Sequence, residues 1–381
     1  MPERKKRVRA TDGSTRKEEV AEPEHKVLGL RLRQLESEGK RGTARYREAS
    51  QEYLEALHRR LREIGCDLSD SDLRNANKPD HEGEIALHKC VYEFFALASG
   101  ARGQTTQKRM DRCVAKTRAL CEAGARVNHK NKYGDAPLLA AAQTDGAEIA
   151  RILIDYGADL NVRNKQGYTP LLMAASENRA NVLAVIAPAV AAHHASSSTS
   201  KTSPLNASSG GYAALHWACI NNSPKMVSVL LKCKADKNCL TEPDKQTALM
   251  KAAAYGAAAC VEQLLRARCD AAATDVDGRT ALHHAAKNKA TLCVQLLISS
   301  GLPCDVLDHH GQKAIFYAAV AKSKPCVTAI SAATPNFNTT PDAAKVKMLL
   351  QGKRLVADDD PFNDNSDSLF GGCFGSASGC F

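Results

Sequence analysis

A short apolar phrase recurs seven times along the chain, and it predicts a stack of similar helical units. The central residue of every copy is Leu or Ile: Leu87, Leu138, Leu171, Leu215, Leu249, Leu282 and Ile315. The spacings between them are 51, 33, 44, 34, 33 and 33 residues. Because a period near 33 fits one helix-turn-helix unit, the two long spacings indicate insertions of 18 and 11 residues.

The polar positions between these phrases predict where helices end. After each phrase come small residues and then a second apolar helix. Gly124, Gly157 and Gly301 stand where that second helix should stop, because glycine readily adopts the left-handed conformation of a helix C-terminus. Lys234 and Arg268 occupy the same place in two other copies, at some local cost.

The phrases themselves carry a family signature. Thr169-Pro170-Leu171-Leu172 and Thr280-Ala281-Leu282-His283 resemble the Thr-Pro-Leu-His signature of ankyrin repeat proteins. Thr caps a helix start and Pro suits its first turn, while Leu points into the core. The resemblance implies an all-α fold, an ankyrin-repeat solenoid of about seven helix-turn-helix repeats with hairpin loops. It covers residues 80–331, with insertions near 99–113 and 191–208.

Outside the repeats we expect four further segments. Residues 1–42 form a basic and mostly disordered N-terminal segment. Residues 43–66 form an amphipathic helix, which either caps the first repeat or pairs with a partner helix as a short coiled coil. Residues 332–355 are the C-terminal cap helix region. Residues 356–381 form an acidic, Phe-, Gly- and Ser-rich tail, which we expect to be disordered.

The cysteines and the apolar stretches of the chain indicate its cellular compartment. The 14 cysteines form no Cys-x-x-Cys pair, and Cys260, Cys293 and Cys326 recur at one repeat position, so we interpret them as reduced core residues. The longest uncharged apolar stretch, residues 182–192, is too short to span a membrane. No apolar segment follows the N-terminal charges, which argues against a secretory signal. We therefore expect a cytoplasmic and/or nuclear protein.

The two ends of the chain carry opposite charge. Lys5, Lys6, Arg7 and Arg9 resemble a short nuclear import signal. No Lys or Arg follows Arg354, whereas five Asp residues do, although the whole chain has a net charge of +10. The tail has four interpretations: a linear motif around Asp360, Pro361 and Phe362 that resembles endocytic adaptor ligands, an activation-type motif, a solubilising tail, or a segment that folds back onto its own basic array.

The sequence contains no motif for catalysis. No nucleophile elbow, phosphate-binding Gly loop, zincin helix or kinase signature occurs in a suitable context. Adjacent His pairs diverge on a helix and do not converge on a metal. His88, His216 and His283 occupy the signature His position, where a structural hydrogen bond is expected. We predict no enzymatic activity, no cofactor and no metal site.

Recognition is then the expected activity. The resemblance implies a concave ligand surface of hairpin tips and first helices, with nine candidate contacts: Tyr133, Tyr168, Tyr212, Trp217, Tyr255, Arg279, His284, Lys287 and Tyr317. Aromatic and Arg side chains are typical interface anchors, and the positive array favours an acidic segment of a protein partner. Nucleic acid is not expected, because no aromatic residues accompany the basic cluster. Oligomeric state stays open.

The predicted function is a non-catalytic protein-protein interaction scaffold or adaptor. The alternative is a nuclear regulator of transcription that combines the import signal, the repeat surface and the acidic aromatic tail. A purely structural tether is the third interpretation.

Overall fold

The structure is a computed structural model of the 381-residue chain. It describes residues 3–9, 15–21, a few positions between 34 and 59, then 75–99, 104–196, 203–334, 337 and 340–352. The chain divides into two compact units, Met1–Pro204 (unit 1) and Leu205–Phe381 (unit 2).

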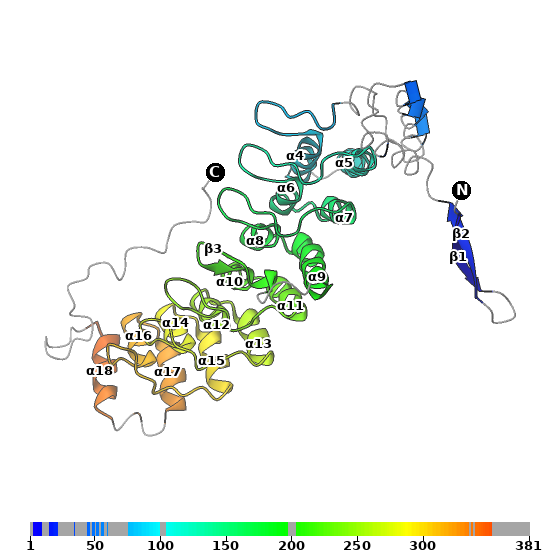
Figure 1. The fold of residues 1–381 in the computed structure, drawn as a ribbon. Coiled ribbons are helices and arrows are strands. Elements are labelled where there is room, and N and C mark those ends of the chain that lie inside the picture. The colour runs from blue at the N-terminus through cyan, green and yellow to red at the C-terminus, as the bar shows by residue number, and fades with distance from the viewer. Residues whose placement is uncertain are drawn as a thin grey trace. The chain divides into compact units, whose positions relative to one another are not determined.

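The described part of unit 1 contains three consecutive helix pairs, drawn in cyan and green in Figure 1. First helices pack on first helices (α4 on α6, α6 on α8) and second helices on second helices (α5 on α7, α7 on α9). The bounds are α4 Ala86–Ser99, α5 Gln104–Glu122, α6 Pro137–Gln143, α7 Ala147–Asp155, α8 Pro170–Ser176 and α9 Ala180–Ser196.

Within the described residues, unit 2 has four helix pairs and a closing helix that packs on α16. The 3₁₀ turn Pro204–Asn206 spans the boundary between the units, and two short strands follow it, β3 Ser208–Ser209 and β4 Tyr212–Ala213. The helices are α10 Ala214–Ile220, α11 Pro224–Lys232, α12 Ala248–Ala254, α13 Ala258–Arg266, α14 Ala281–Lys287, α15 Thr291–Ser299, α16 Ala314–Val320, α17 Lys324–Ala333 and α18 Pro341–Leu350.

Local sequence explains the helix ends. Thr169 Oγ1 accepts a hydrogen bond from the Leu172 amide at 3.3 Å, and Pro170 occupies the first turn. Gly124 and Gly157 end second helices with φ of +81° and +82°, the left-handed conformation predicted for them. Lys234 adopts the same conformation with φ of +63°.

Small and aliphatic side chains form the core. All seven phrase residues, from Leu87 to Ile315, are buried. Cys260, Cys293 and Cys326 are 0% exposed, which confirms that they are core residues, and the described cysteines are free thiols. Burial raises the pKa of the Cys260 and Cys293 thiols to about 11, so both are protonated at neutral pH.

Helices near the two predicted insertions are longer than the regular ones. The regular first and second helices of unit 2 run 7 and 9 residues, but α4 and α5 run 14 and 19. Likewise α9 extends to 17 residues and contains Pro188. The added residues lie at the C-terminal ends of α4 and α9, where Ala is frequent and favours helix, and at the polar N-terminal end of α5. Residues 197–202 lie outside the described part.

Two parts of the N-terminal segment 1–42 are described as strands. Two strands, β1 Glu3–Arg9 and β2 Thr15–Ala21, pair antiparallel with Lys5 opposite Glu19. A two-stranded ribbon needs only main-chain pairing and cross-strand partners, so it leaves no apolar pattern in the sequence. The described positions between 44 and 59 are helical, and Ala49 and Ala56 among them are buried.

Candidate functional site

Each regular hairpin tip is held by one Asn or Asp side chain. In unit 1, Asn131 Oδ1 accepts hydrogen bonds from the backbone amides of Tyr133 at 3.0 Å and Asp135 at 2.9 Å. In unit 2, Asp275 Oδ1 accepts from Asp277 at 3.0 Å and Arg279 at 2.8 Å. Because one oxygen ties two amides, each tip has a fixed shape. Asp80, Asn164 and Asp308 repeat the arrangement.

Successive tips are joined by a backbone hydrogen bond. Within unit 1 the Lys165 amide donates to the carbonyl of Tyr133 at 3.1 Å. Within unit 2 the His309 amide donates to the carbonyl of Asp277 at 2.8 Å. Each unit therefore presents its tips as a row in fixed register.

The signature histidines are structural, as predicted. His216 Nδ1 accepts from the Ala213 amide at 3.1 Å, and its Nε2–H donates to the carbonyl of Cys239 at 3.0 Å. Both ring nitrogens are satisfied by the neutral ring, and burial lowers the pKa of His216 to about 4. His88 and His283 make the equivalent bonds.

Two of the predicted contact residues are buried in an ionic network. Arg279 and Tyr317 are 8% and 6% exposed. Arg279 Nη1 contacts Asp277 Oδ2 at 2.6 Å, and its Nε donates to Tyr317 Oη at 3.1 Å. Tyr317 in turn donates to Asp308 Oδ2 at 2.5 Å, and that carboxylate is fully buried. These side chains join one tip to the next repeat, so their present contacts serve the fold.

His284 belongs to the same region. It is 8% exposed, and its Nε2 lies 2.9 Å from Asp275 Oδ2. Burial pushes the pKa of Asp275 upward, but the hydrogen bonds from His284 and the Arg279 amide outweigh burial and hold that pKa below its usual value. Lys287, at the end of α14, is half-buried.

An aromatic and cationic cluster combines two half-buried rings with Lys251, which is 8% exposed. Tyr212 on β4 and Trp217 on α10 have ring centroids 5.3 Å apart. Lys251 of α12 lies 4.9 Å from the centre of the Tyr212 ring, and its Nζ donates to Tyr212 Oη at 3.3 Å. Trp217 and Tyr212 are half-buried, and the Trp217 Nε1 has no hydrogen-bond partner within the described residues. Two neighbouring first helices thus bring two aromatic rings and a cation together.

The other predicted tyrosines lie apart from this cluster. Tyr133 is 54% exposed at a tip of unit 1, where Lys132 lies over its ring. Its hydroxyl group donates a hydrogen bond to Glu82 Oε2 at 3.3 Å. Tyr168 is half-buried at the next tip. Tyr255 is also 54% exposed, but it stands at the turn after α12. The import residues lie on β1, and Asp360, Pro361 and Phe362 fall outside the described residues.

The turns between first and second helices of unit 2 carry one group of side chains of which the sequence analysis named only Tyr255 and missed the lysines. We call this group the unit 2 turn edge: Lys225, Tyr255, Lys289, Lys322 and Lys324, all exposed. Lys289 and Lys322 have left-handed backbones, with φ of +60° and +57°. Their spacing of 33 residues is a signal that was present in the sequence.

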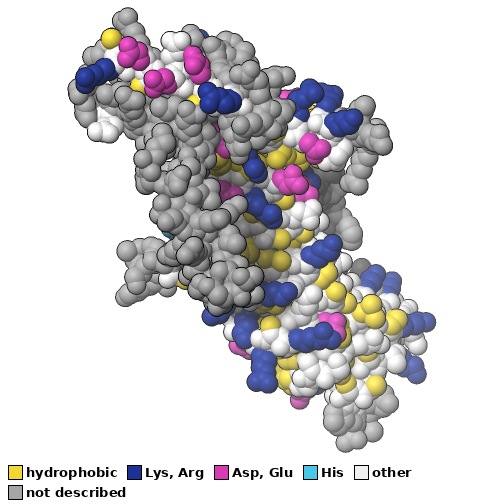
Figure 2. Space-filling view, turned by 90° about the vertical axis from the view of Figure 1, so that its right-hand side faces the viewer, with side chains coloured by type: hydrophobic (Ala, Val, Ile, Leu, Met, Phe, Trp, Pro, Cys, Tyr) yellow, Lys and Arg dark blue, Asp and Glu magenta, His cyan; other side chains and the backbone are white. Residues whose placement is uncertain are grey.

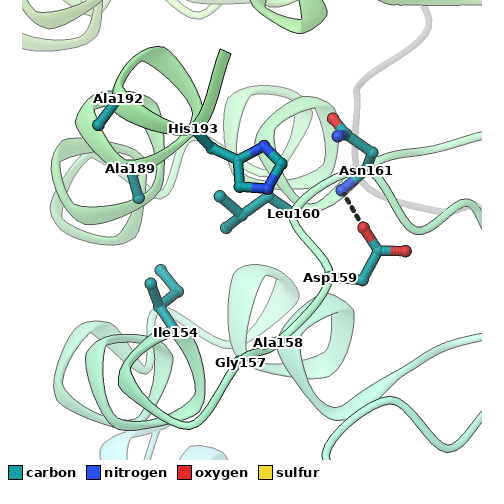
Figure 3. A pocket seen from close by; sticks show the side chains of 9 residues that line it. All are labelled: Ile154, Gly157, Ala158, Asp159, Leu160, Asn161, Ala189, Ala192 and His193. Carbon is teal, nitrogen blue, oxygen red and sulfur yellow. Dashed lines mark hydrogen bonds between the residues drawn. The ribbon is translucent and has the colours of Figure 1, made fainter. Parts of the chain in front are cut away.

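The surface carries no recognisable catalytic constellation in the described residues. An open pocket of 610 Å³ lies between the end of α7 and the long helix α9, lined largely by apolar and small residues (Figure 3). Asp159 in its wall accepts the backbone amide of Asn161 at 2.9 Å, and His193 lies across from it. Among the described residues, no group of three or more His, Cys, Asp or Glu is arranged to bind a metal. No described helix is long and apolar enough to span a membrane.

Comparison with known proteins agrees with the repeat fold. A model of the family described as ankyrin repeats (3 copies) matches residues 111–196, 165–243, 190–275 and 249–340. Among solved structures, the chain resembles the ankyrin repeat domain of Bcl-3, described as a unique member of the IκB family, with a TM-score of 0.51 and 20% identity. The match covers 66% of this chain and 99% of that domain. No curated protein matches the sequence.

Proposed function

Because the chain belongs to the ankyrin repeat family, we propose that it is a non-catalytic scaffold that binds a protein partner through its hairpin tips and first helices. Tips of fixed shape and register support this proposal, because a preformed surface pays little ordering cost on binding. The observation that carries it is the cluster of Tyr212, Trp217 and Lys251. Such aromatic and cationic side chains are typical anchors at interfaces.

The chemistry of the cluster indicates the kind of partner. Lys251 supplies a positive charge over the Tyr212 ring, with 8% of the residue exposed. An acidic segment with an adjacent apolar side chain fits these groups, because its carboxylate pairs with the cation and its apolar group packs on the rings. The positive net charge of the chain favours the same partner. Figure 2 shows dark blue Lys and Arg side chains together with some magenta Asp and Glu on the face that it draws.

Affinity capture from cell extract tests the proposal. Full-length protein should retain partners that Trp217→Ala loses at least tenfold, while both chains unfold at similar denaturant concentrations. Leu292→Ala is the matched control, because Leu292 is an apolar side chain 66% exposed on the second helix α15. Partners kept by Trp217→Ala but lost by Leu292→Ala would place recognition on the second helices and reject the proposal.

The basic run on β1 supports a second candidate, a nuclear regulator. Lys5, Lys6, Arg7 and Arg9 put four cations into one short strand, a composition typical of import signals. A tagged full-length chain should then accumulate in the nucleus, and a variant with these four residues changed to Ser should not. Equal cytoplasmic residence of both chains would remove this candidate.

A further inference from the structure

The turns between first and second helices of unit 2 carry one sign of charge. Residues 221–225, 255–258, 287–291 and 320–324 contain five lysines and no Asp or Glu. The corresponding turns of unit 1, residues 143–148 and 176–180, contain Asp145, Glu148 and Glu177 against Arg179. The positive potential at the unit 2 turn edge is therefore concentrated, and acids in the same turns do not cancel it.

The lysines of this edge are available for an anion. Lys225, Lys289, Lys322 and Lys324 are exposed, and within the described chain none of them forms an ion pair. Tyr255, 54% exposed, adds an aromatic ring in the turn between those of Lys225 and Lys289.

The fold does not require lysine at two of these positions. Lys289 and Lys322 take up the left-handed backbone that Asn178 adopts in unit 1, with φ of +57°, and that Gly256 adopts in unit 2, with φ of +68°. Asn and Gly reach this conformation more easily than Lys does. The lysines thus bring charge to the edge at a conformational cost.

The acidic tail begins beside this edge. Gly352 follows the last helix, α18, and a Cβ built on it would lie 3.9 Å from Lys322 Nζ. Residues 353–381 follow, with their five Asp between Asp358 and Asp367. An extended chain spans roughly 3.5 Å per residue, and packed helices lie about 10 Å apart, so these residues reach every turn of the edge.

We propose that residues 358–367 of the tail dock on the unit 2 turn edge of the same chain. The Asp carboxylates pair with Lys289, Lys322 and Lys324, and Phe362 packs on Tyr255. Tethering places the acids at an effective concentration of about 1 mM or more, so weak pairs suffice. The docked tail neutralises the edge and excludes other acidic segments from it. This proposal does not depend on the surface around Trp217.

Zero-length carbodiimide cross-linking of the full chain tests the contact directly. It joins Lys amines to carboxylates that touch, so peptides linking Lys289, Lys322 or Lys324 to Asp358–Asp367 are expected. Lys232, exposed on the second helix α11, is the control amine and should not react with the tail. The links should disappear in 0.5 M salt. The Debye length is then about 4–5 Å, so the attraction between exposed charges is largely screened. Equal tail links at Lys232, or none at low salt, would overturn the proposal.

Mixing isotope-labelled and unlabelled chains identifies which chain supplies the tail. Docking within one chain gives links of uniform label only. Links of mixed label would show that the tail binds a second copy and would overturn the intramolecular proposal.

Competition tests the consequence for other ligands. A fluorescent peptide of residues 353–381 should bind at least tenfold more tightly to a full-length variant with all five tail Asp changed to Asn than to the natural chain, because the tethered competitor is gone. Adding Lys289→Asn and Lys322→Asn to that variant should abolish binding. Equal peptide affinity for the natural and Asp-free chains rejects the proposal. So does a variant that binds phosphatidylserine vesicles or RNA but not the peptide, since the edge would then serve another anion.

Discussion

The two units build the same tip and the same turn from side chains of different charge. Two tips of unit 1 close on neutral Asn131 and Asn164 and a third on the partly exposed Asp80, whereas two tips of unit 2 close on the buried Asp275 and Asp308. One oxygen holds the backbone in both cases. The second oxygen of Asp is a buried anion that needs a partner, and Arg279, Tyr317 or His284 supplies it.

The turns between first and second helices also differ in charge, but here unit 2 carries the more positive side chains. Left-handed positions are Asp145 and Asn178 in unit 1, but Lys289 and Lys322 in two turns of unit 2. Backbone geometry is shared, so it does not dictate the charge. Charges inside the tips of unit 2 make contacts within the fold, whereas the exposed lysines at its turns form no ion pair within the described residues.

The largest expected effect is the loss of the buried cation of unit 2. Arg279→Ala leaves the fully buried Asp308 carboxylate without its cation, and removing one partner of a buried pair costs about 3 kcal/mol or more. Tyr168→Ala alters the same tip position in unit 1, where Tyr168 is half-buried and uncharged, and should cost less. Urea unfolding followed by hydrogen exchange in each unit measures both. An equal cost for the two variants would remove the distinction between the tips.

Acid should weaken unit 2 before unit 1. Burial lowers the folded-state pKa of His216 to about 4 from 6.5, so the unfolded chain binds the proton first. The neutral ring of His216 therefore contributes fully to the free energy of unfolding above pH 6.5. This contribution, on the order of 3 kcal/mol, is lost as pH falls from 6.5 toward 4. His283 adds to the effect in unit 2, whereas unit 1 has only His88 at this position and Leu in its other two repeats.

Hydrogen exchange between pH 7 and pH 4.5 checks this order. His216→Leu should flatten the pH dependence of unit 2, because Leu139 and Leu172 fill the same position in unit 1. An unchanged pH slope in His216→Leu would exclude a role for this ring.

The smallest expected effect comes from the turns. Lys289→Asn and Lys322→Asn should each raise the free energy of unfolding by about 0.5–1 kcal/mol, because Asn tolerates a positive φ better than Lys does. The reverse change in unit 1, Asn178→Lys, should lower it by a similar amount. Lys287→Asn, inside α14, is the control and should give no gain. Thermal unfolding resolves these differences, and a loss of stability in Lys289→Asn would refute the conformational argument.

The sequence predicted what depends on local chemistry. The phrase spacing located the repeats, Gly124 and Gly157 marked helix ends, and His216 was assigned a structural hydrogen bond. Each depends on a backbone preference or a contact fixed by the repeat period.

The sequence did not predict the side-chain contacts between neighbouring repeats. Arg279 and Tyr317 were predicted to face a ligand, yet they meet across 38 residues and are buried against Asp308. Periodicity gives positions but not which side chains fill the space between neighbouring repeats. The length of α9 was not predicted for a related reason, because Ala-rich sequence suits either a connection or a longer helix until its packing is known.

Site-specific photo-cross-linking tests the central claim most directly, that this scaffold binds proteins through its tips and first helices. A benzoylphenylalanine replaces Tyr212 in one full-length chain and Leu292 in another, and each is irradiated in cell extract. The account predicts that the chain labelled at position 212 captures a protein that the chain labelled at position 292 does not. Capture from position 292 alone, or from neither position, would contradict it.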